Sequence, residues 1–132
     1  MKYTIENEQI NAELGYGAIQ ISPDDTKGYR PFELFVSSLA GCSGTLLRNI
    51  LTKKRIPYGR LEFDVDYVRN PDQANRIEKL MFTAKVYTEE SITAEQAEKL
   101  ANLVLKNCGM IQSVIQSIEI HFQIQSILSG DN

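Results

Sequence analysis

The sequence predicts an α+β fold, and three observations support this class. Several short segments alternate apolar and polar residues, which is the period of strands packed on one face. Two longer segments repeat apolar residues every three or four positions, as amphipathic helices do. The 132 residues, 42% of them hydrophobic and 23% charged, have the balance of one globular domain. Because no repeat or linker divides the chain, we expect a single domain over residues 1–132.

The elements are expected in the order strand, strand, helix, strand, strand, helix, short helix, strand. The expected strands cover Lys2–Glu6, Ala18–Ser22, Leu61–Tyr67, Leu80–Val86 and Ile118–Ile124. The expected helices cover about Pro31–Thr52, then Thr93–Cys108, then Met110–Gln116. The third and fourth strands should pair antiparallel, since a turn of Asn70, Pro71 and Asp72 joins them. The tail from Ser126 to Asn132 should be frayed.

The first helix is expected to carry Cys42 on its buried face. Its stripe of apolar residues consists of Phe35, Leu39, Cys42, Leu46 and Ile50. Gly41 and Gly44 lie in the same stretch, although each glycine inside a helix costs roughly 1 kcal/mol relative to alanine. This cost suggests close approach by a strand, a second helix, a partner subunit or a ligand, and the sequence does not choose among them.

The second helix is expected to start at a capping box, because Thr93 is followed three residues later by Gln96. It should end at Cys108, with Gly109 as the stop. Cys108 therefore lies at a helix-to-helix junction, where the start of the next helix would stabilise a thiolate.

The composition argues against a nucleic-acid partner and against a metal site. A net charge of -3 argues against a nucleic-acid partner, and the basic run Lys53–Arg55 suits the end of a helix. His121 is expected on the polar face of the last strand, and it is the chain's one histidine. With two widely separated cysteines beside it, this set is too small for a zinc site, and no metal or other cofactor is expected.

The N-terminal residues lack the basic start, apolar stretch and cleavage site of a signal peptide, and no uninterrupted apolar run reaches the length of a bilayer. We therefore expect a soluble, cytoplasmic protein with no membrane partner. In that compartment two cysteines are expected to be reduced thiols rather than a structural disulfide.

Each thiol has a structural interpretation and a chemical one. Free cysteine is among the most buried residue types and often serves as a small core side chain. Against this, Cys42 lies among small residues that could admit a substrate, and Cys108 lies where a thiolate would be stabilised. On these grounds alone the two interpretations stay open.

The segment Pro31–Cys42, with the sequence PFELFVSSLAGC, is followed much later by Lys106-Asn107-Cys108 and a final apolar strand. In these features the chain resembles the OsmC/Ohr family of osmotically inducible and organic hydroperoxide resistance proteins. The resemblance extends from roughly Gly15 to Ile124. It implies an intertwined homodimer in which antiparallel sheets wrap around long central helices.

The resemblance also implies thiol peroxidase chemistry in oxidative-stress defence. Cys42 would attack an organic hydroperoxide, and Cys108 would then form a disulfide with it that an external dithiol reduces. Phe32, Phe35 and Leu39 would line an apolar substrate pocket.

The chain departs from the family pattern at the residues that support the thiolate. In the best-characterised peroxidases of the family, a glutamate ten residues before the first cysteine holds an arginine from the N-terminal sheet. Phe32 occupies that glutamate position here, Glu33 follows it, and the first arginine of the chain is Arg30. Arg30 and Glu33 are therefore candidate assisting residues. The alternative hypothesis is a non-enzymatic relative that binds a small apolar ligand or a partner in the dimer cavity, with inert cysteines.

Overall fold

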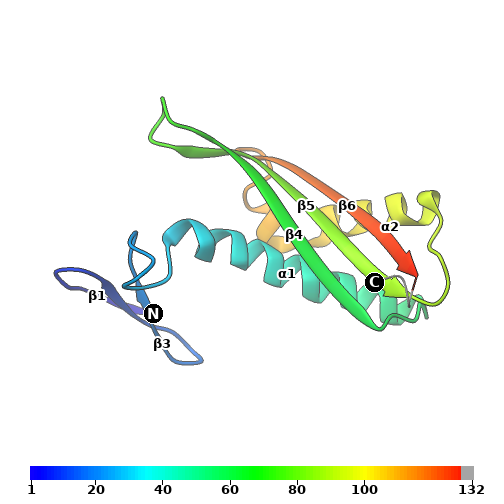
Figure 1. Cartoon of the computed structure of the whole chain (residues 1–132), viewed down its shortest axis with the longest axis horizontal. Helices are drawn as coiled ribbons and strands as arrows, with labels where there is room; N and C mark the ends of the chain where they lie inside the picture. The colour runs from blue at the N-terminus through cyan, green and yellow to red at the C-terminus, as the bar shows by residue number, and fades with distance from the viewer. Residues whose placement is uncertain (129–132) are drawn as a thin grey trace. The chain divides into compact units, whose positions relative to one another are not determined.

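In the computed structural model, which describes residues 1–128, the N-terminal segment folds as an antiparallel meander (Figure 1). Its strands are β1 (Lys2–Ile5), β2 (Ile10–Glu13) and β3 (Ala18–Ile21), with β2 in the middle. The strand β2 is not among the strands expected from the sequence. The apolar residues Ile10 and Ala12 alternate with polar ones over too few positions to signal a strand. Pairing with β1 on one edge and β3 on the other determines the extended conformation.

The meander has one apolar face. The register aligns Tyr3 with Ala12 and Ile19, and Ile5 with Ile10 and Ile21, so these side chains share that face. Tyr3 is 53% exposed and Ile5 is 79% exposed. The described structure therefore covers only part of this apolar surface.

A tight loop connects the meander to the first helix. The Lys27 N–H donates to the Asp24 carbonyl at 3.0 Å, and the Tyr29 N–H donates to the Gln20 carbonyl at 2.8 Å. Gly28 lies so close to β3 that a Cβ there would be 2.7 Å from the Gln20 carbonyl oxygen. The loop thus needs glycine at this position, and it fixes the chain just before the helix.

The helix α1 (Pro31–Lys53) matches the predicted helix to within one residue at its end. Its fully buried side chains are Leu39, Ser43, Leu47 and Leu51. This line is offset from the predicted stripe, and Cys42 lies beside it, half-buried. The expectation that Cys42 is on the buried face is wrong in this respect, because apolar spacing locates the stripe but not its most buried edge.

The remaining residues form a second sheet with the strand order β4-β5-β6. Its strands are β4 (Arg60–Asn70), β5 (Arg76–Thr88) and β6 (Glu119–Leu128). The predicted antiparallel pairing of β4 and β5 is confirmed. β6 pairs parallel to β5, which requires a crossover, and α2 (Ala94–Asn107) and α3 (Gly109–Gln112) supply it.

Two boundary predictions are wrong in this region. α3 ends at Gln112, four residues before the predicted end at Gln116. Hydrogen-bonded backbone turns that extend to Ser117 replace the second half of the predicted helix. The tail was expected to fray from Ser126, but Ser126–Leu128 pair with β5. The rest of that tail, residues 129–132, lies outside the described residues.

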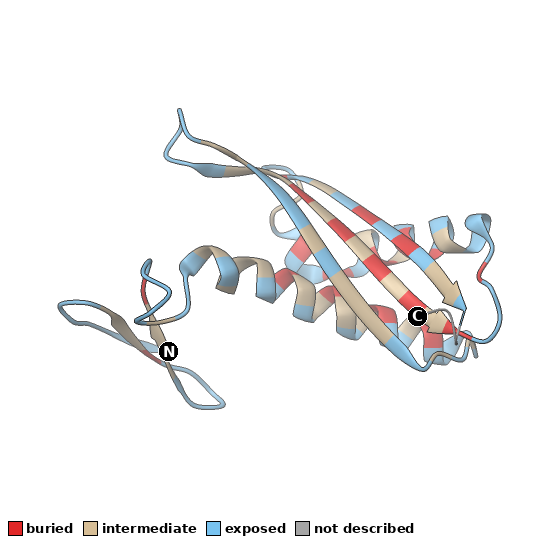
Figure 2. Ribbon diagram, viewed as in Figure 1, coloured by how far each residue is buried: buried red, intermediate tan, exposed pale blue. Residues whose placement is uncertain are grey.

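The second sheet has one apolar face and one polar face. Phe63, Phe82 and Phe122 meet on the apolar face, with ring centroids 5.6 Å apart for Phe63 and Phe122 and 6.0 Å for Phe82 and Phe122. In Figure 1 the α2 helix and the part of α1 after residue 39 lie on the same side of this sheet. Figure 2 shows that β5 and β6 carry most of its buried positions, whereas β4 is half-buried or exposed.

The helix α1 is long and apolar enough to meet a length-and-composition test for a membrane span, with a mean hydropathy of 1.3 over its best 18-residue window. The expectation from the sequence was based on uninterrupted apolar runs, which do not reveal this property of α1. One such helix is weak support for a membrane span, because the core helix of a soluble domain has the same character.

Candidate functional site: a pair of thiols

Two helices bring the two cysteines together. Cys42 lies in the middle of α1, and Cys108 is the residue between α2 and α3, where it ends one helix and begins the other. The Cys108 N–H donates to the Val104 carbonyl at 2.9 Å, and the Cys108 carbonyl accepts from the Gln112 N–H at 2.9 Å. Its backbone is therefore held on both sides, and its side chain is 1% exposed.

Backbone amides and the second thiol surround the Cys42 sulfur. The pKa of Cys42 is lowered, first by a hydrogen bond from the Met110 backbone N–H and then by one from the Cys108 side chain. Burial opposes this shift, and the Gly109 N–H adds to it. A thiolate at Cys42 is stabilised because several donors point at it.

The pKa of Cys108 shifts in the opposite direction. Burial is the main cause and raises it, while a hydrogen bond from the Ile111 N–H lowers it. The neighbouring Cys42 raises it further, because a second thiolate beside the first would be repelled. The Cys42 thiol is therefore expected to ionise before the Cys108 thiol, which donates a hydrogen bond to it.

This arrangement places a thiol of lowered pKa beside a thiol of raised pKa. Both cysteines are free in the structure. Cys42 is half-buried and so open to a small molecule, whereas Cys108 is enclosed. A thiolate with a second thiol beside it is the arrangement that forms a disulfide after oxidation of the first sulfur.

The candidate assisting residues Arg30 and Glu33 form an ion pair with each other. Both side chains are about half exposed, and both line a surface cavity of 460 Å³ together with Gln20 and Tyr29. These residues belong to the compact unit of residues 1–39, whereas the two cysteines belong to the unit that follows it. The structure therefore brings Arg30 together with Glu33, and Cys42 together with Cys108. The ion pair and the thiol pair belong to different units.

The three predicted pocket residues share one face of the first turns of α1. Leu39 is buried, while Phe32 and Phe35 are half-buried. Spacings of three and four residues place these side chains in one row. Their role in a substrate pocket stays a prediction.

The remaining polar candidate, His121, is exposed on the polar face of β6, as predicted. It lies 2.7 Å from the Glu119 carboxylate and lowers the pKa of that group. Among residues 1–128, no three His, Cys, Asp or Glu side chains are grouped so that they could hold a metal ion.

Sequence reasoning missed the donors of Gly109 and Met110, because they are backbone groups. It placed a stabilised thiolate at Cys108, where their amides begin. The structure directs these amides chiefly at Cys42. The sequence does indicate a helix start at Cys108-Gly109, where free backbone amides are expected. It does not indicate which of the two sulfurs accepts hydrogen bonds from them.

The fold and the site define an α+β protein that carries a pair of thiols. One thiol lies in the middle of a long helix, and the other lies at the junction of α2 and α3. The chain belongs to the OsmC-like protein family, whose model matches residues 23–123. This confirms the resemblance found in the sequence. The family has a soluble fold, and α1 alone is weak support for a membrane span.

Several solved structures share the fold. A hypothetical protein from Aquifex aeolicus has a TM-score of 0.84 at 18% identity, covering 97% of this chain and 95% of its own. An OsmC like protein from Mycoplasma pneumoniae has a TM-score of 0.76 at 17% identity, with 98% of each chain covered. An organic hydroperoxide resistance protein from Elizabethkingia anophelis has a TM-score of 0.73 at 14% identity, covering 96% of this chain and 94% of its own. At these identities the likeness shows the fold alone. Comparison with curated proteins finds no match.

Proposed function

We propose that this protein is a thiol-dependent peroxidase that reduces organic hydroperoxides in oxidative-stress defence. The observation that carries the proposal is the opposite shift of the two thiol pKa values. Hydrogen bonds from the Met110 amide and the Cys108 thiol lower the pKa of Cys42, whereas burial raises the pKa of Cys108.

In the first step the Cys42 thiolate attacks the outer oxygen of the hydroperoxide. The S–O bond forms as the O–O bond breaks, and the alkoxide takes up a proton and leaves as an alcohol. The sulfur is oxidised to a sulfenic acid, and the peroxide is reduced by two electrons. The backbone amides of Gly109 and Met110 stabilise the Cys42 thiolate before the attack.

In the second step the Cys108 sulfur attacks the sulfenic sulfur of Cys42. An S–S bond forms, and the hydroxyl leaves as water with the proton from Cys108. An external dithiol then reduces the disulfide by thiol–disulfide exchange and is itself oxidised, which returns both thiols. We propose no cofactor for this cycle.

Arg30 and Glu33 are proposed to assist the first step. The resemblance to the family motivates this, because its peroxidases use an arginine held by a glutamate to stabilise the thiolate. The ion pair of Arg30 with Glu33 supports the proposal, although the two residues here are close in sequence. Phe32, Phe35 and Leu39 are proposed to favour an organic peroxide over hydrogen peroxide.

The active form is proposed to be a homodimer. The meander leaves Tyr3 and Ile5 exposed on its apolar face, and exposed apolar surface of this kind marks an interface. A second copy of the chain is the partner that the family resemblance implies. The cytoplasm is the proposed location, since both cysteines are free thiols in the structure.

The proposed activity can be tested by following peroxide consumption with dithiothreitol as the reductant. Cumene hydroperoxide should be consumed faster than hydrogen peroxide. Cys42→Ser should abolish turnover, and Cys108→Ser should block recycling through the disulfide. If the wild-type protein consumes neither peroxide faster than dithiothreitol alone, the account fails, and ligand binding in a dimer cavity with inert cysteines becomes the better account.

A further inference from the structure

We propose a second site, separate from the thiol pair, that binds a small amphiphilic monocarboxylate. It is a pocket of 310 Å³ lined by Lys54, Ile56, Gln96, Lys99 and Leu100. The pocket lies between the end of α1 and the first turns of α2. Its lining combines two ammonium groups and an amide with two branched apolar side chains.

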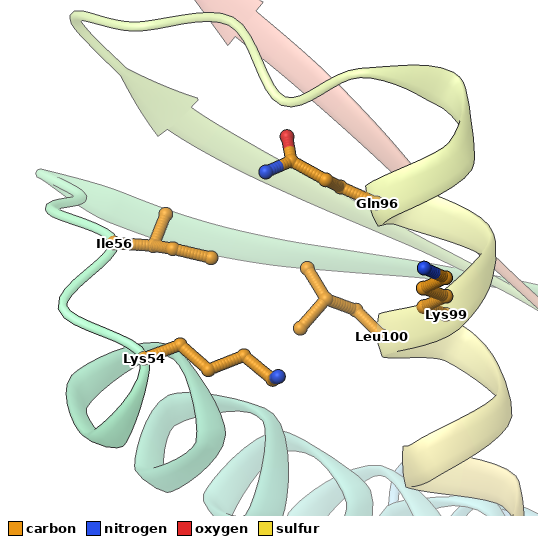
Figure 3. A pocket seen from close by; sticks show the side chains of 5 residues that line it. All are labelled: Lys54, Ile56, Gln96, Lys99 and Leu100. Carbon is orange, nitrogen blue, oxygen red and sulfur yellow. The ribbon is translucent and has the colours of Figure 1, made fainter.

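Figure 3 shows how these side chains are arranged. Ile56 and Leu100 point toward each other across the pocket, from the loop after α1 and from α2. The Lys54 side chain lies along the α1 side, and Lys99 stands on α2 one residue before Leu100. Leu100 is 2% exposed, so the floor of the pocket is part of the core rather than a loose surface.

The backbone at the end of α1 fixes the position of Lys54 and Ile56. The Ile56 N–H donates to the Leu51 carbonyl at 2.9 Å, and the Arg55 N–H donates to the Thr52 carbonyl at 3.1 Å. This pair of bonds is the Schellman ending of a helix, which places Arg55 in the left-handed region at φ 57°. A residue other than glycine is disfavoured there, so the surrounding structure holds this turn in place.

The polar groups of the pocket favour an anion. Lys54 makes no ion pair with any carboxylate of residues 1–128. Lys99 lies 3.4 Å from Glu95, but both side chains are more than 70% exposed, and such pairs are weak. The Gln96 side-chain oxygen accepts from Thr93, which leaves its amide NH₂ group as a donor toward the pocket.

The pocket is distant from the thiol pair along both helices. Lys54 follows the end of α1 and is twelve positions after Cys42, which is a rise of about 18 Å along the helix. Cys108, which caps the end of α2, is eight positions after Leu100, a rise of about 12 Å. A ligand bound here would therefore not contact the reacting sulfurs.

The dimensions select the ligand class. A volume of 310 Å³ is at the lower end of the range of about 300–1,000 Å³ found for ligand pockets, so a short chain fits and a long lipid does not. A lysine ammonium at the edge of the pocket would bind the carboxylate, and Ile56 with Leu100 would bind the chain. Octanoate is a suitable probe of this chemistry.

The test is a titration of methyl-labelled protein with octanoate, followed by the methyl NMR signals of Ile56 and Leu100. We expect saturable shifts of both signals. Lys54→Gln should weaken binding by about threefold, and Lys54→Gln with Lys99→Gln by about tenfold, because each lysine contributes as a partly exposed charge. Lys106→Gln is the matched control, since it removes a lysine of α2 outside the pocket, and it should leave the affinity unchanged.

Two further probes separate the parts of the proposal. Octanol has the chain without the charge, and acetate has the charge without the chain, so both should bind more weakly than octanoate. The proposal is overturned if octanoate gives no saturable shift at Ile56 and Leu100. It is also overturned if octanol binds equally well or if the double lysine variant binds as tightly as the wild type.

Discussion

Cys42 and Cys108 hydrogen-bond through their side chains, and this one contact lowers the pKa of Cys42 while it raises that of Cys108. The two thiols have the same intrinsic chemistry, so the difference arises from their surroundings. Cys42 accepts hydrogen bonds from the backbone amides of Gly109 and Met110, which follow the helix junction. Cys108 is desolvated by burial in the core. These surroundings favour ionisation of Cys42 before Cys108, which is the order that the proposed peroxidase cycle needs.

The first prediction concerns the pH dependence of alkylation by iodoacetamide. The thiolate is the reactive form, and rising pH ionises the group with the lower pKa first. Cys42 should therefore be labelled with an apparent pKa below its ordinary value of 9.0, and Cys108 only at higher pH. Peptide mass spectrometry of samples labelled across a pH series measures both profiles.

Two variants of Cys108 identify the cause of this shift. Cys108→Ala removes the side-chain donor, so the pKa of Cys42 should rise. Cys108→Ser retains a hydroxyl donor at the same position, so the pKa should rise less. Equal alkylation profiles for the two variants would show that the contact between the side chains does not set the reactivity of Cys42.

The second prediction concerns the proposed assisting pair. Arg30→Ala and Glu33→Gln should each slow the reaction of Cys42 with cumene hydroperoxide by about tenfold, which is about 1.4 kcal/mol of transition-state stabilisation. Stability in urea should change by no more than about 1 kcal/mol, since the ion pair is half exposed. Stopped-flow measurement of thiol loss gives the rate.

Lys27→Ala is the control for this pair. It removes a cation of the same region whose ion pair with Glu8 has an N–O distance of 3.0 Å. The control should react at the wild-type rate. If all three variants react at that rate, Arg30 and Glu33 have no part in the chemistry.

The third prediction contrasts two glycines. A Cβ at Gly44 would lie 3.8 Å from two ring carbons of Phe63, an ordinary contact, so Gly44→Ala should stabilise α1 by about 0.5–1 kcal/mol. A Cβ at Gly28 would lie 2.7 Å from the Gln20 carbonyl oxygen, so Gly28→Ala should destabilise the meander by about 1–3 kcal/mol. Urea unfolding of both variants measures these changes, and a loss of stability for Gly44→Ala would mean that something packs closely on that glycine.

The fourth prediction concerns the start of α2, the helix that carries Cys108 at its end. Thr93 accepts from the Gln96 N–H at 3.1 Å, and the Gln96 side chain accepts from the Thr93 N–H at 3.1 Å. Thr93→Ala should therefore cost about 1 kcal/mol of stability. Thr52→Ala, in the last turn of α1, removes a hydroxyl with no capping role and should be close to neutral. Equal losses in the two variants would contradict the capping account.

The sequence predicts the helices and the second sheet well, because their apolar periods are long. The capping box at Thr93 and the antiparallel pairing of β4 and β5 are confirmed. Short or end segments were predicted poorly. β2 has only two apolar residues, and the last residues of β6 are ordered by pairing with β5, which no local pattern reveals.

The candidate site was predicted in part. The two cysteines could be chosen from the family motif and from their placement, and the structure brings them into contact. The amides of Gly109 and Met110 could not be assigned, because the direction of a backbone group depends on how α2 and α3 pack against α1. The pocket at Lys54 and Lys99 was also missed, since its residues come from segments about 40 positions apart whose contact is tertiary.

The most direct test is intact-mass spectrometry of the reduced protein after addition of one equivalent of cumene hydroperoxide. The account predicts rapid loss of two hydrogens in the wild type, as Cys42 and Cys108 form a disulfide. In Cys108→Ser it predicts a sulfenic acid trapped at Cys42, and in Cys42→Ser it predicts no reaction. Persistence of both thiols through excess peroxide would contradict the proposed peroxidase cycle.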